Sequence, residues 1–536
     1  MKKVLKYLVP LVLLMLGSCT DREEIIDPGE PANPVLRLIT PSVSYLVIPQ
    51  EEEVRLAFNV KDPAYQFKYD VSSPDCQVSI MQTNGKTPTG FYLKEVLPGD
   101  TQGAYVAVIA DAGNSVPYDV YAAITISTGR DSYVQSAGIR IMMEKDPEGA
   151  VDTGLPVVFV NTENGVAIYS KTDYVKATFS VKGTDTLPGL DPVSCRVRGR
   201  GNTTWTWPKK PYLVALDEQA SVLGMPKHKR WVLLANFMDR TLMRNLVSMK
   251  VSSMMSNLAW TPRCVPVELV LNGRHNGSYL LIEQVRVDKD RVNISKDGGY
   301  LFELDFHYDN AVQWIDSHGK CAGVSGGIPF SVKYPDSDEI TQEQKTWAKS
   351  YINDVAGVIY GSNFKDPEEG YAKYLDVDSF IDYWIVYEVM TNHELGNPGS
   401  VMFHKDPAGK LTAGPCWDFD WGVLSFYTSG GEYDLVNGKA IWYRRLFEDP
   451  DFKAKVKARF LEMKPQLLTI PDYMDECRAL LSKSAKLNFA MWNPAEDASM
   501  NGGYIINGDE NLTFDKAVDR LKKNFNTHMK VIESKL

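Results

Sequence analysis

Short alternating runs of apolar and polar residues fill the chain from about residue 36 to residue 144. Residues 54–58 and 121–126 are examples, and Gly, Pro, Asn and Asp separate one run from the next. Alternation with a period of two indicates strands with one buried face. Many short strands separated by frequent turn residues are typical of a β-sandwich. We therefore predict a small all-β, immunoglobulin-like sandwich over residues 35–145.

Strands continue in the next part of the chain, together with one clear helix. Apolar side chains alternate over residues 265–271, Asn272 and Gly273 form a turn signal, and a second apolar run covers residues 279–285. An Asn-Gly pair between two such runs is a strong signal for a β-hairpin. Before the hairpin, Asp239 can cap a helix with one apolar side.

Helical periodicity dominates after about residue 340. Asp378 precedes a segment with apolar side chains on one helical face, and residues 513–535 have the pattern of an amphipathic helix. A strand-rich half followed by a helix-rich half predicts a two-lobed α+β domain over residues 155–536.

The first residues have the pattern of an export signal. A basic start precedes an apolar stretch over residues 7–16, which is too short to span a bilayer, and the segment ends in Leu-Gly-Ser-Cys. This ending resembles a bacterial lipobox; an ordinary cleavable signal is the alternative. We predict a lipoprotein signal peptide over residues 1–18, lipidation of Cys19 and a flexible tether over residues 19–34.

The acidic residues after Cys19 resemble the export signal of surface lipoproteins in Bacteroidetes. We therefore expect an exported lipoprotein at the outer membrane or cell surface of a Gram-negative bacterium, held there by its lipid anchor. A formal net charge of −10 at pH 7 argues against a nucleic-acid partner, whose binding usually rests on a positive face. The 7 cysteines are widely scattered and show no zinc-binding spacing.

Two carboxylates lie two residues apart in the aromatic segment 415–422. If this segment is a strand, Asp418 and Asp420 share a face, and their charges repel unless a cation or protein donors lie between them. The pair therefore predicts a site for a divalent metal. An edge strand whose Asp residues cap a turn is an equally good interpretation.

A basic segment with two glycines lies near residue 200. Alternation directs Arg196, Arg198 and Arg200 to one side of a strand, and the glycines allow the backbone to approach a ligand closely. Guanidinium groups match phosphate oxygens, and Lys209 or Lys210 adds a positive charge. These residues suit a polyphosphate; a solvated basic edge strand has the same pattern.

Three more polar residues are candidates for the same site. Glu283 interrupts an apolar strand, so it either pairs with a buried Lys or Arg or faces solvent. Glu394 and Asn397 follow the helix that begins near Asp378, and a return of the chain would bring them to the cavity of Asp418. An ordinary polar loop after a helix is the alternative.

Taken in order, these segments resemble the spore coat protein H (CotH) kinase family over about residues 155–535. The similarity is greatest to lipoprotein variants of gut Bacteroidetes, in which an immunoglobulin-like domain often precedes the kinase-like domain. The matching stretches are residues 198–205, 209–212, 223–225, 231–236, 244–245, 269–283, 290–293, 378–380 and 417–420.

The resemblance implies an atypical protein-kinase fold that binds ATP with Mg²⁺ or Mn²⁺, and some members phosphorylate Ser or Thr of secreted proteins. Asp418 matches the metal-binding aspartate, with Asp420 and Asn397 as further candidate ligands. The implied nucleotide-binding residues are Lys209 or Lys210 on the phosphates, Arg198 or Arg200 beside them, and Glu283 as the partner of the lysine.

One position departs from the family pattern. The family carries Asn-x-Asp with a catalytic Asp, whereas this chain has Asn392, His393 and Glu394. One extra methylene displaces the carboxylate by roughly 1 Å, which can cost about a hundredfold in rate. Two functions follow: a kinase with Glu394 in the catalytic position, or an inactive surface lipoprotein that binds a glycan or protein through Trp205 and Trp207.

Overall fold

The computed structural model describes residues 39–41, 45–49, 53–60, 76–82, 91–97, 104–110, 118–127, 132–144, 152–306, 312–492 and 506–536. The predicted signal peptide, the lipidation site at Cys19 and the tether over residues 19–34 lie outside the described residues and stay predictions. Among the helices that the structure describes, none is long and apolar enough to cross a membrane.

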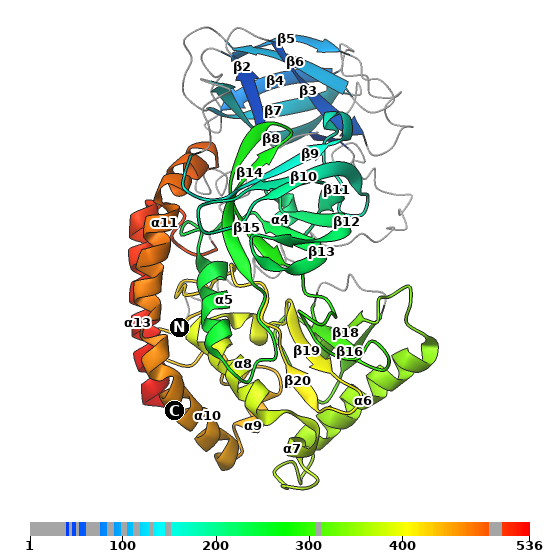
Figure 1. The fold of residues 1–536 in the computed structure, drawn as a ribbon, viewed down its shortest axis with the longest axis vertical. Helices are drawn as coiled ribbons and strands as arrows, with labels where there is room; N and C mark the ends of the chain where they lie inside the picture. Colours follow the sequence, from blue (N-terminus) through cyan, green and yellow to red (C-terminus); the bar gives the residue numbers. More distant parts are fainter. Residues whose placement is uncertain are drawn as a thin grey trace.

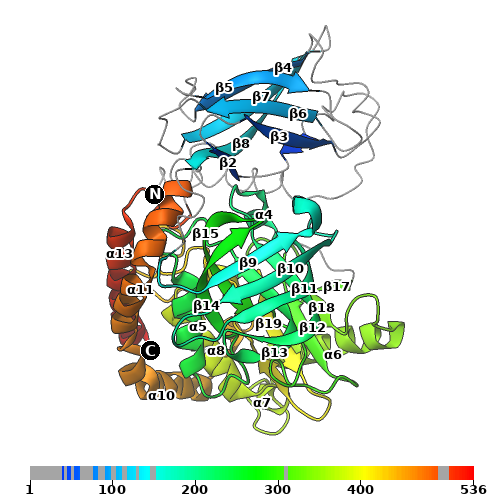
Figure 2. The ribbon, with the colours of Figure 1, turned by 45° about the horizontal axis from the view of Figure 1, so that its top comes forward.

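Two four-stranded sheets form the part of the chain before residue 150 (Figure 2). Their strand orders are β1-β3-β6-β5 and β2-β8-β7-β4, and neighbouring strands are antiparallel except for β2 and β8. The strand content agrees with the prediction for residues 35–145, whereas the immunoglobulin likeness stays a prediction. The strands are β1 (Ile39–Pro41), β2 (Tyr45–Pro49), β3 (Glu53–Val60), β4 (Cys76–Gln82), β5 (Phe91–Leu97), β6 (Ala104–Ala110), β7 (Tyr118–Ser127) and β8 (Ser132–Glu144).

A closed seven-stranded barrel follows, in the order β10-β11-β12-β13-β15-β14-β9 (Figure 1). It closes where β14 runs parallel to β9, with Leu269 opposite Val158. Alternate apolar residues fill the interior, and Phe179, Val197 and Trp231 are fully buried there. Alternation predicted the strands but not the barrel, because the pattern of a single strand does not show which edges meet. The strands are β9 (Val157–Thr162), β10 (Val175–Lys182), β11 (Leu190–Gly199), β12 (Tyr212–Val222), β13 (Met225–Leu234), β14 (Cys264–Leu271) and β15 (Arg274–Glu283).

The predicted hairpin is β14 and β15. Asn272 and Gly273 have φ values of 51° and 76°, the left-handed conformation that a two-residue hairpin turn requires. The Oδ1 atom of Asn272 also accepts a hydrogen bond from the Thr162 backbone N–H at 2.8 Å. The turn therefore helps to close the barrel as well as reversing the chain.

The helix predicted near Asp239 is α5 (Arg244–Met254), which begins at Arg244. Asp239 binds its first turn, because Oδ2 accepts a hydrogen bond from the Arg244 backbone N–H at 2.8 Å. Leu246 and Met249 are buried in the core, as the periodicity predicted.

An antiparallel five-stranded sheet forms the next layer, in the order β17-β18-β16-β19-β20. The chain is thus α+β, as predicted; the kinase likeness of its lobes stays a prediction. The helix predicted at Asp378 is α8, whose N-cap is Asp376 instead, with Oδ1 accepting from the Ser379 N–H at 3.3 Å. The elements are β16 (Tyr300–Leu304), β17 (Gln313–Asp316), β18 (Ile328–Tyr334), α6 (Gln342–Tyr360), α7 (Tyr371–Tyr374), α8 (Val377–Val389), β19 (Val401–Lys405) and β20 (Leu411–Ala413).

Long helices complete the chain along one side of the barrel and the sheet (Figure 1). The predicted C-terminal helix is confirmed as α13, and the Thr513 side chain accepts a hydrogen bond from the Lys516 N–H at 3.4 Å. Helix α11 packs against both α13 and β15, so it joins the helices to the barrel. The helices are α9 (Tyr443–Leu446), α10 (Pro450–Leu467), α11 (Ile470–Met491) and α13 (Phe514–Lys535).

Candidate functional site

A cleft of about 620 Å³ lies between the barrel and the five-stranded sheet. Its barrel side includes Val232 of β13 and the segment 284–287 that follows β15. Its sheet side includes Leu301, Val332 and Met402, one from each of β16, β18 and β19. Apolar residues in the lining of a cleft suit a flat ring system.

The other part of the cleft is polar and charged. Arg200, Gly201 and Asn202 line it from the loop after β11, and Glu303 and Asp305 line it from the sheet. The Arg200 guanidinium also lies over the ring of Trp417, 5.6 Å from the ring centroid. This stacking brings the aromatic segment 415–422 to the cleft.

A cluster of carboxylates, Glu394, Asp418 and Asp420, lies near Arg200 and Asp305 of this polar end, although none of the three lines the cleft. Burial raises the pKa of Glu394 well above its usual value, and Asp418, Asp420 and Asp305 raise it further. Burial and, to a smaller extent, the charge of Asp418 raise the pKa of Asp420 to about 8, although the positive charge of Arg200 opposes the shift. A charged side chain shifts the pKa of another side chain in this way only when the two lie close together. The structure thus brings together Glu394, Asp418 and Asp420, which are up to 26 residues apart in sequence.

Two buried oxygens in the segment after α8 have no hydrogen-bond partner among the described residues: Oε2 of Glu394 and Oδ1 of Asn397. Carboxylate and amide oxygens are the ligands that Mg²⁺ and Mn²⁺ prefer. Among the described residues, however, no group of three or more His, Cys, Asp and Glu side chains is arranged to hold an ion by itself. The residues therefore fit a cation that takes its other ligands from phosphate, which is how Mg²⁺ is usually bound in nucleotide sites.

The acidic segment is a loop, and the strand geometry predicted for Asp418 and Asp420 is wrong. The φ angle of Asp418 is 64°, in the left-handed region, and residues 414–420 form no strand. Hydrogen bonds hold the loop instead: the Phe419 N–H donates to Asn245 Oδ1 at 2.8 Å, and Asn392 Nδ2 donates to the Asp418 carbonyl at 3.2 Å. Contacts with residues distant in the sequence therefore fix the loop that carries the two carboxylates, and the alternation of a strand does not determine their directions.

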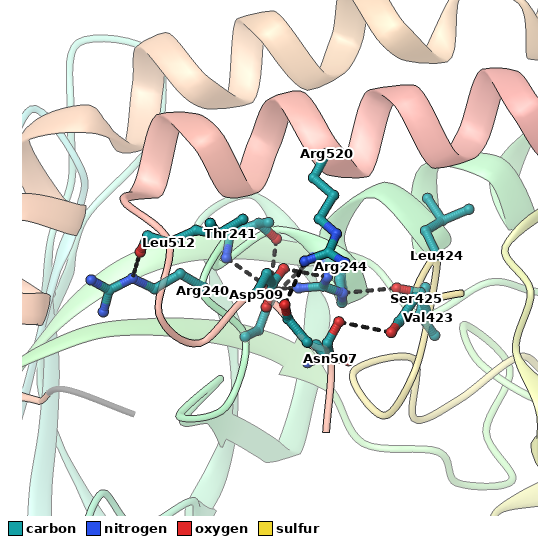
Figure 3. Close-up of polar contacts among 12 residues, drawn as sticks. Arg240, Thr241, Arg244, Val423, Leu424, Ser425, Asn507, Asp509, Leu512 and Arg520 are labelled. Carbon is teal, nitrogen blue, oxygen red and sulfur yellow. Dashed lines mark hydrogen bonds and ion pairs between the residues drawn. The ribbon is translucent and has the colours of Figure 1, made fainter. Parts of the chain in front are cut away.

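A buried arginine secures the continuation of this loop (Figure 3). Arg244 Nε donates to the Val423 carbonyl at 2.8 Å, Nη2 lies 2.6 Å from Asp509 Oδ2, and Nη1 pairs with Asp239. Asn507 adds a contact, since its Oδ1 accepts from the Gly422 N–H at 2.9 Å. The sequence predicted Asp239 as a helix cap and placed Arg244 in a family-matching stretch, but it assigned no role to Val423, Asn507 or Asp509.

A model of the CotH kinase protein family matches residues 197–532. The chain belongs to this family. No curated protein matches the chain significantly. The matched region runs from β11 into α13, so the cleft and the carboxylate cluster lie inside the part that the CotH kinase family shares.

Lys209, one of the two lysines that the CotH resemblance suggested for phosphate binding, is fully buried. Its Nζ donates to the Ala235 carbonyl and to Asn488 Oδ1, each at 2.8 Å, and to the Ser278 carbonyl. Burial lowers the pKa of Lys209 to about 7. The side chain joins the barrel to α11 and does not line the cleft.

Lys210 and Glu283 also lie elsewhere. The Lys210 ammonium donates to the Trp205 carbonyl at 2.8 Å, outside the lining of the cleft. Glu283 is fully buried and pairs with Arg263, with 2.9 Å between Oε2 and Nε, rather than with either lysine. The structure therefore does not form the lysine–glutamate pair that we expected.

Of the two arginines expected at the nucleotide, Arg200 lines the cleft and Arg198 packs against Tyr174 outside it. Two cations that the sequence reasoning missed also line the cleft. Lys333 pairs with Glu303 at 2.7 Å, and Arg286 pairs with Asp336 at 2.7 Å. The alternation of apolar and polar residues in β18 was the sequence signal that could have identified Lys333 as a residue facing the cleft.

Proposed function

We propose that this CotH family protein binds ATP with Mg²⁺ or Mn²⁺ in the cleft and acts as a kinase-like phosphotransferase. The carrying observation is the buried Oε2 of Glu394, which has no hydrogen-bond partner among the described residues and lies near the carboxylates of Asp418 and Asp420. Oxygens left without donors in a carboxylate cluster suit a cation. The apolar part of the cleft, around Val232, offers the nucleotide base a dry surface.

The residues divide into three roles. When bound, ATP would supply the phosphoryl group and the divalent cation would offset the negative charge of its phosphates. Asp418, with Asp420 and Asn397, would hold the cation, and Arg200 would donate hydrogen bonds to phosphate oxygens. Glu394 would accept the proton of the Ser or Thr hydroxyl on a surface protein. Its raised pKa makes it a stronger base once it is ionised.

We also propose that the protein works outside the cytoplasm, held at the outer membrane by a lipid on Cys19. Support comes from the basic, apolar and Leu-Gly-Ser-Cys pattern of the first residues. Mass spectrometry of the protein from its native membrane would test this. An N-terminal fragment that begins at Cys19 and carries acyl chains is expected, and an unmodified fragment would contradict the anchor.

Nucleotide binding is tested by thermal unfolding with ATP and Mn²⁺, since a ligand that binds only the folded state raises the melting temperature. We expect a rise for the wild type and for Asp185→Asn, an exposed aspartate on the barrel, and no rise for Asp418→Asn. Equal rises in all three proteins would contradict binding at Asp418.

The alternative is an inactive surface lipoprotein that binds a glycan or protein. Glu394 favours it, because a glutamate replaces the family aspartate and burial favours its protonated form. The tryptophans predicted as contacts are poorly placed for that role: Trp207 is buried and stacks with Trp421, and Trp205 lies against Lys210. Transfer of labelled phosphate to protein would exclude this alternative. Glycan binding without any transfer would support it.

A further inference from the structure

A basic face, consisting of Tyr174, Lys176, Arg196, Arg198 and Arg230, covers the outside of the barrel. In the strand register, Lys176 lies opposite Arg196, Arg196 opposite Ala215, and Ala215 opposite Arg230. Side chains opposite each other in a sheet share a face, so three cations form a row across β10, β11 and β13, with only the small Ala215 between them.

Tyr174 is the centre of this basic face. The guanidinium carbons of Arg198, Arg196 and Arg230 lie 5.2, 5.4 and 5.8 Å from the centroid of its ring. Arg230 Nη1 also donates a hydrogen bond to the Tyr174 hydroxyl at 2.7 Å. One tyrosine thus holds three guanidinium groups around one point of the surface.

The positive charge of the basic face is not neutralised. Among the described residues, no carboxylate forms an ion pair with Lys176, Arg196, Arg198 or Arg230, and the buried Nε of Arg198 has no hydrogen-bond partner. Burial alone would raise the pKa of Tyr174, yet Arg198 and Arg230 outweigh it and leave that pKa below its usual value. The local field therefore stabilises negative charge.

We propose that the basic face is a second anion-binding site, separate from the cleft, that takes a phosphate group as free phosphate or as a monoester. A phosphate dianion offers three oxygens to three guanidinium groups, whereas a carboxylate offers two oxygens and one charge. None of the five residues lines the cleft. The site therefore does not depend on the proposed nucleotide binding.

Calorimetric titration of the full chain with inorganic phosphate, phosphoserine and inorganic sulfate tests the proposal. We expect phosphate and phosphoserine to bind, and the Arg196→Gln/Arg230→Gln variant to bind them at least about tenfold more weakly, because each guanidinium contributes a charge-assisted hydrogen bond. Lys227→Gln, at an exposed lysine of β13 outside the basic face, is the matched control and should bind like the wild type.

Two further variants test whether phosphate binds at the basic face. Tyr174→Phe keeps the ring and releases Arg230 from its hydroxyl partner, so binding should persist. Asp418→Asn should also bind phosphate, since Asp418 is not part of the basic face. Loss of binding in Asp418→Asn, or unchanged binding in the double arginine variant, would overturn the proposal. Tighter binding of sulfate than of phosphate would also overturn it.

Discussion

Arg244 and Asp509 form a buried ion pair, with 2.6 Å between Nη2 and Oδ2. The first residue of α5 is thereby joined to the loop before α13, and Arg244 also holds the Val423 carbonyl. The segment that follows Asp418 and Asp420 is thus attached, through Val423, to the start of α5 and to the loop before α13 (Figure 3).

Arg244→Met is expected to destabilise the protein by about 3–5 kcal/mol, because it leaves the carboxylates of Asp239 and Asp509 buried without their partner. Chemical denaturation measures the change. Lys464→Met is the control, since its pair with Glu533 is partly exposed and should contribute at most about 1 kcal/mol. Similar losses of unfolding free energy in both variants would show that the buried ion pair contributes no more to stability than the partly exposed one.

Arg200→Gln is expected to weaken binding of ATP with Mn²⁺ about tenfold, because it removes a charge-assisted donor from the polar end of the cleft. Lys210→Gln should bind like the wild type, since Lys210 does not line the cleft. Isothermal titration calorimetry distinguishes the two. A loss confined to Lys210→Gln would restore the role that the family resemblance gave to that lysine.

Glu394→Asp recreates the family pattern and is expected to raise phosphate transfer, up to about a hundredfold if the carboxylate moves by roughly 1 Å into position. Glu394→Gln should abolish transfer, because an amide cannot accept the proton. The assay follows labelled phosphate from ATP to a protein acceptor. If wild type and both variants transfer equally, Glu394 is not the base.

His228 predicts a dependence of stability on pH. Burial, together with a smaller effect of the charge of Arg291, lowers its pKa to about 4. Between pH 6.5 and pH 4 the unfolded chain therefore binds a proton that the folded chain does not. Acidification through this window favours unfolding.

The expected loss from His228 is about 1 kcal/mol after allowance for solvent screening, and it should appear in denaturation at pH 7 and pH 4. His228→Asn keeps an acceptor for the Arg230 backbone N–H and does not titrate, so its stability should change less with pH. An identical pH dependence in both proteins would exclude His228 as a cause.

Local patterns predicted the elements whose signals lie close together in sequence. The hairpin at Asn272 and Gly273 and the start of α13 after Thr513 are confirmed because turn geometry and helix capping depend on adjacent residues. Helix starts were less well predicted: α5 begins at Arg244, five residues after Asp239, whose side chain still binds its first turn, and α8 is capped by Asp376.

The sequence by itself determined the α+β content, the alternation of the barrel strands and the presence of polar residues that suit a phosphate and metal site. Tertiary structure alone decided which of them meet. Lys209 donates a hydrogen bond to Asn488, 279 residues away, and lies outside the cleft. Glu394, in contrast, lies near Asp418. The physical reason is that the partner and the burial of a charged side chain depend on packing between distant segments, which periodicity does not encode.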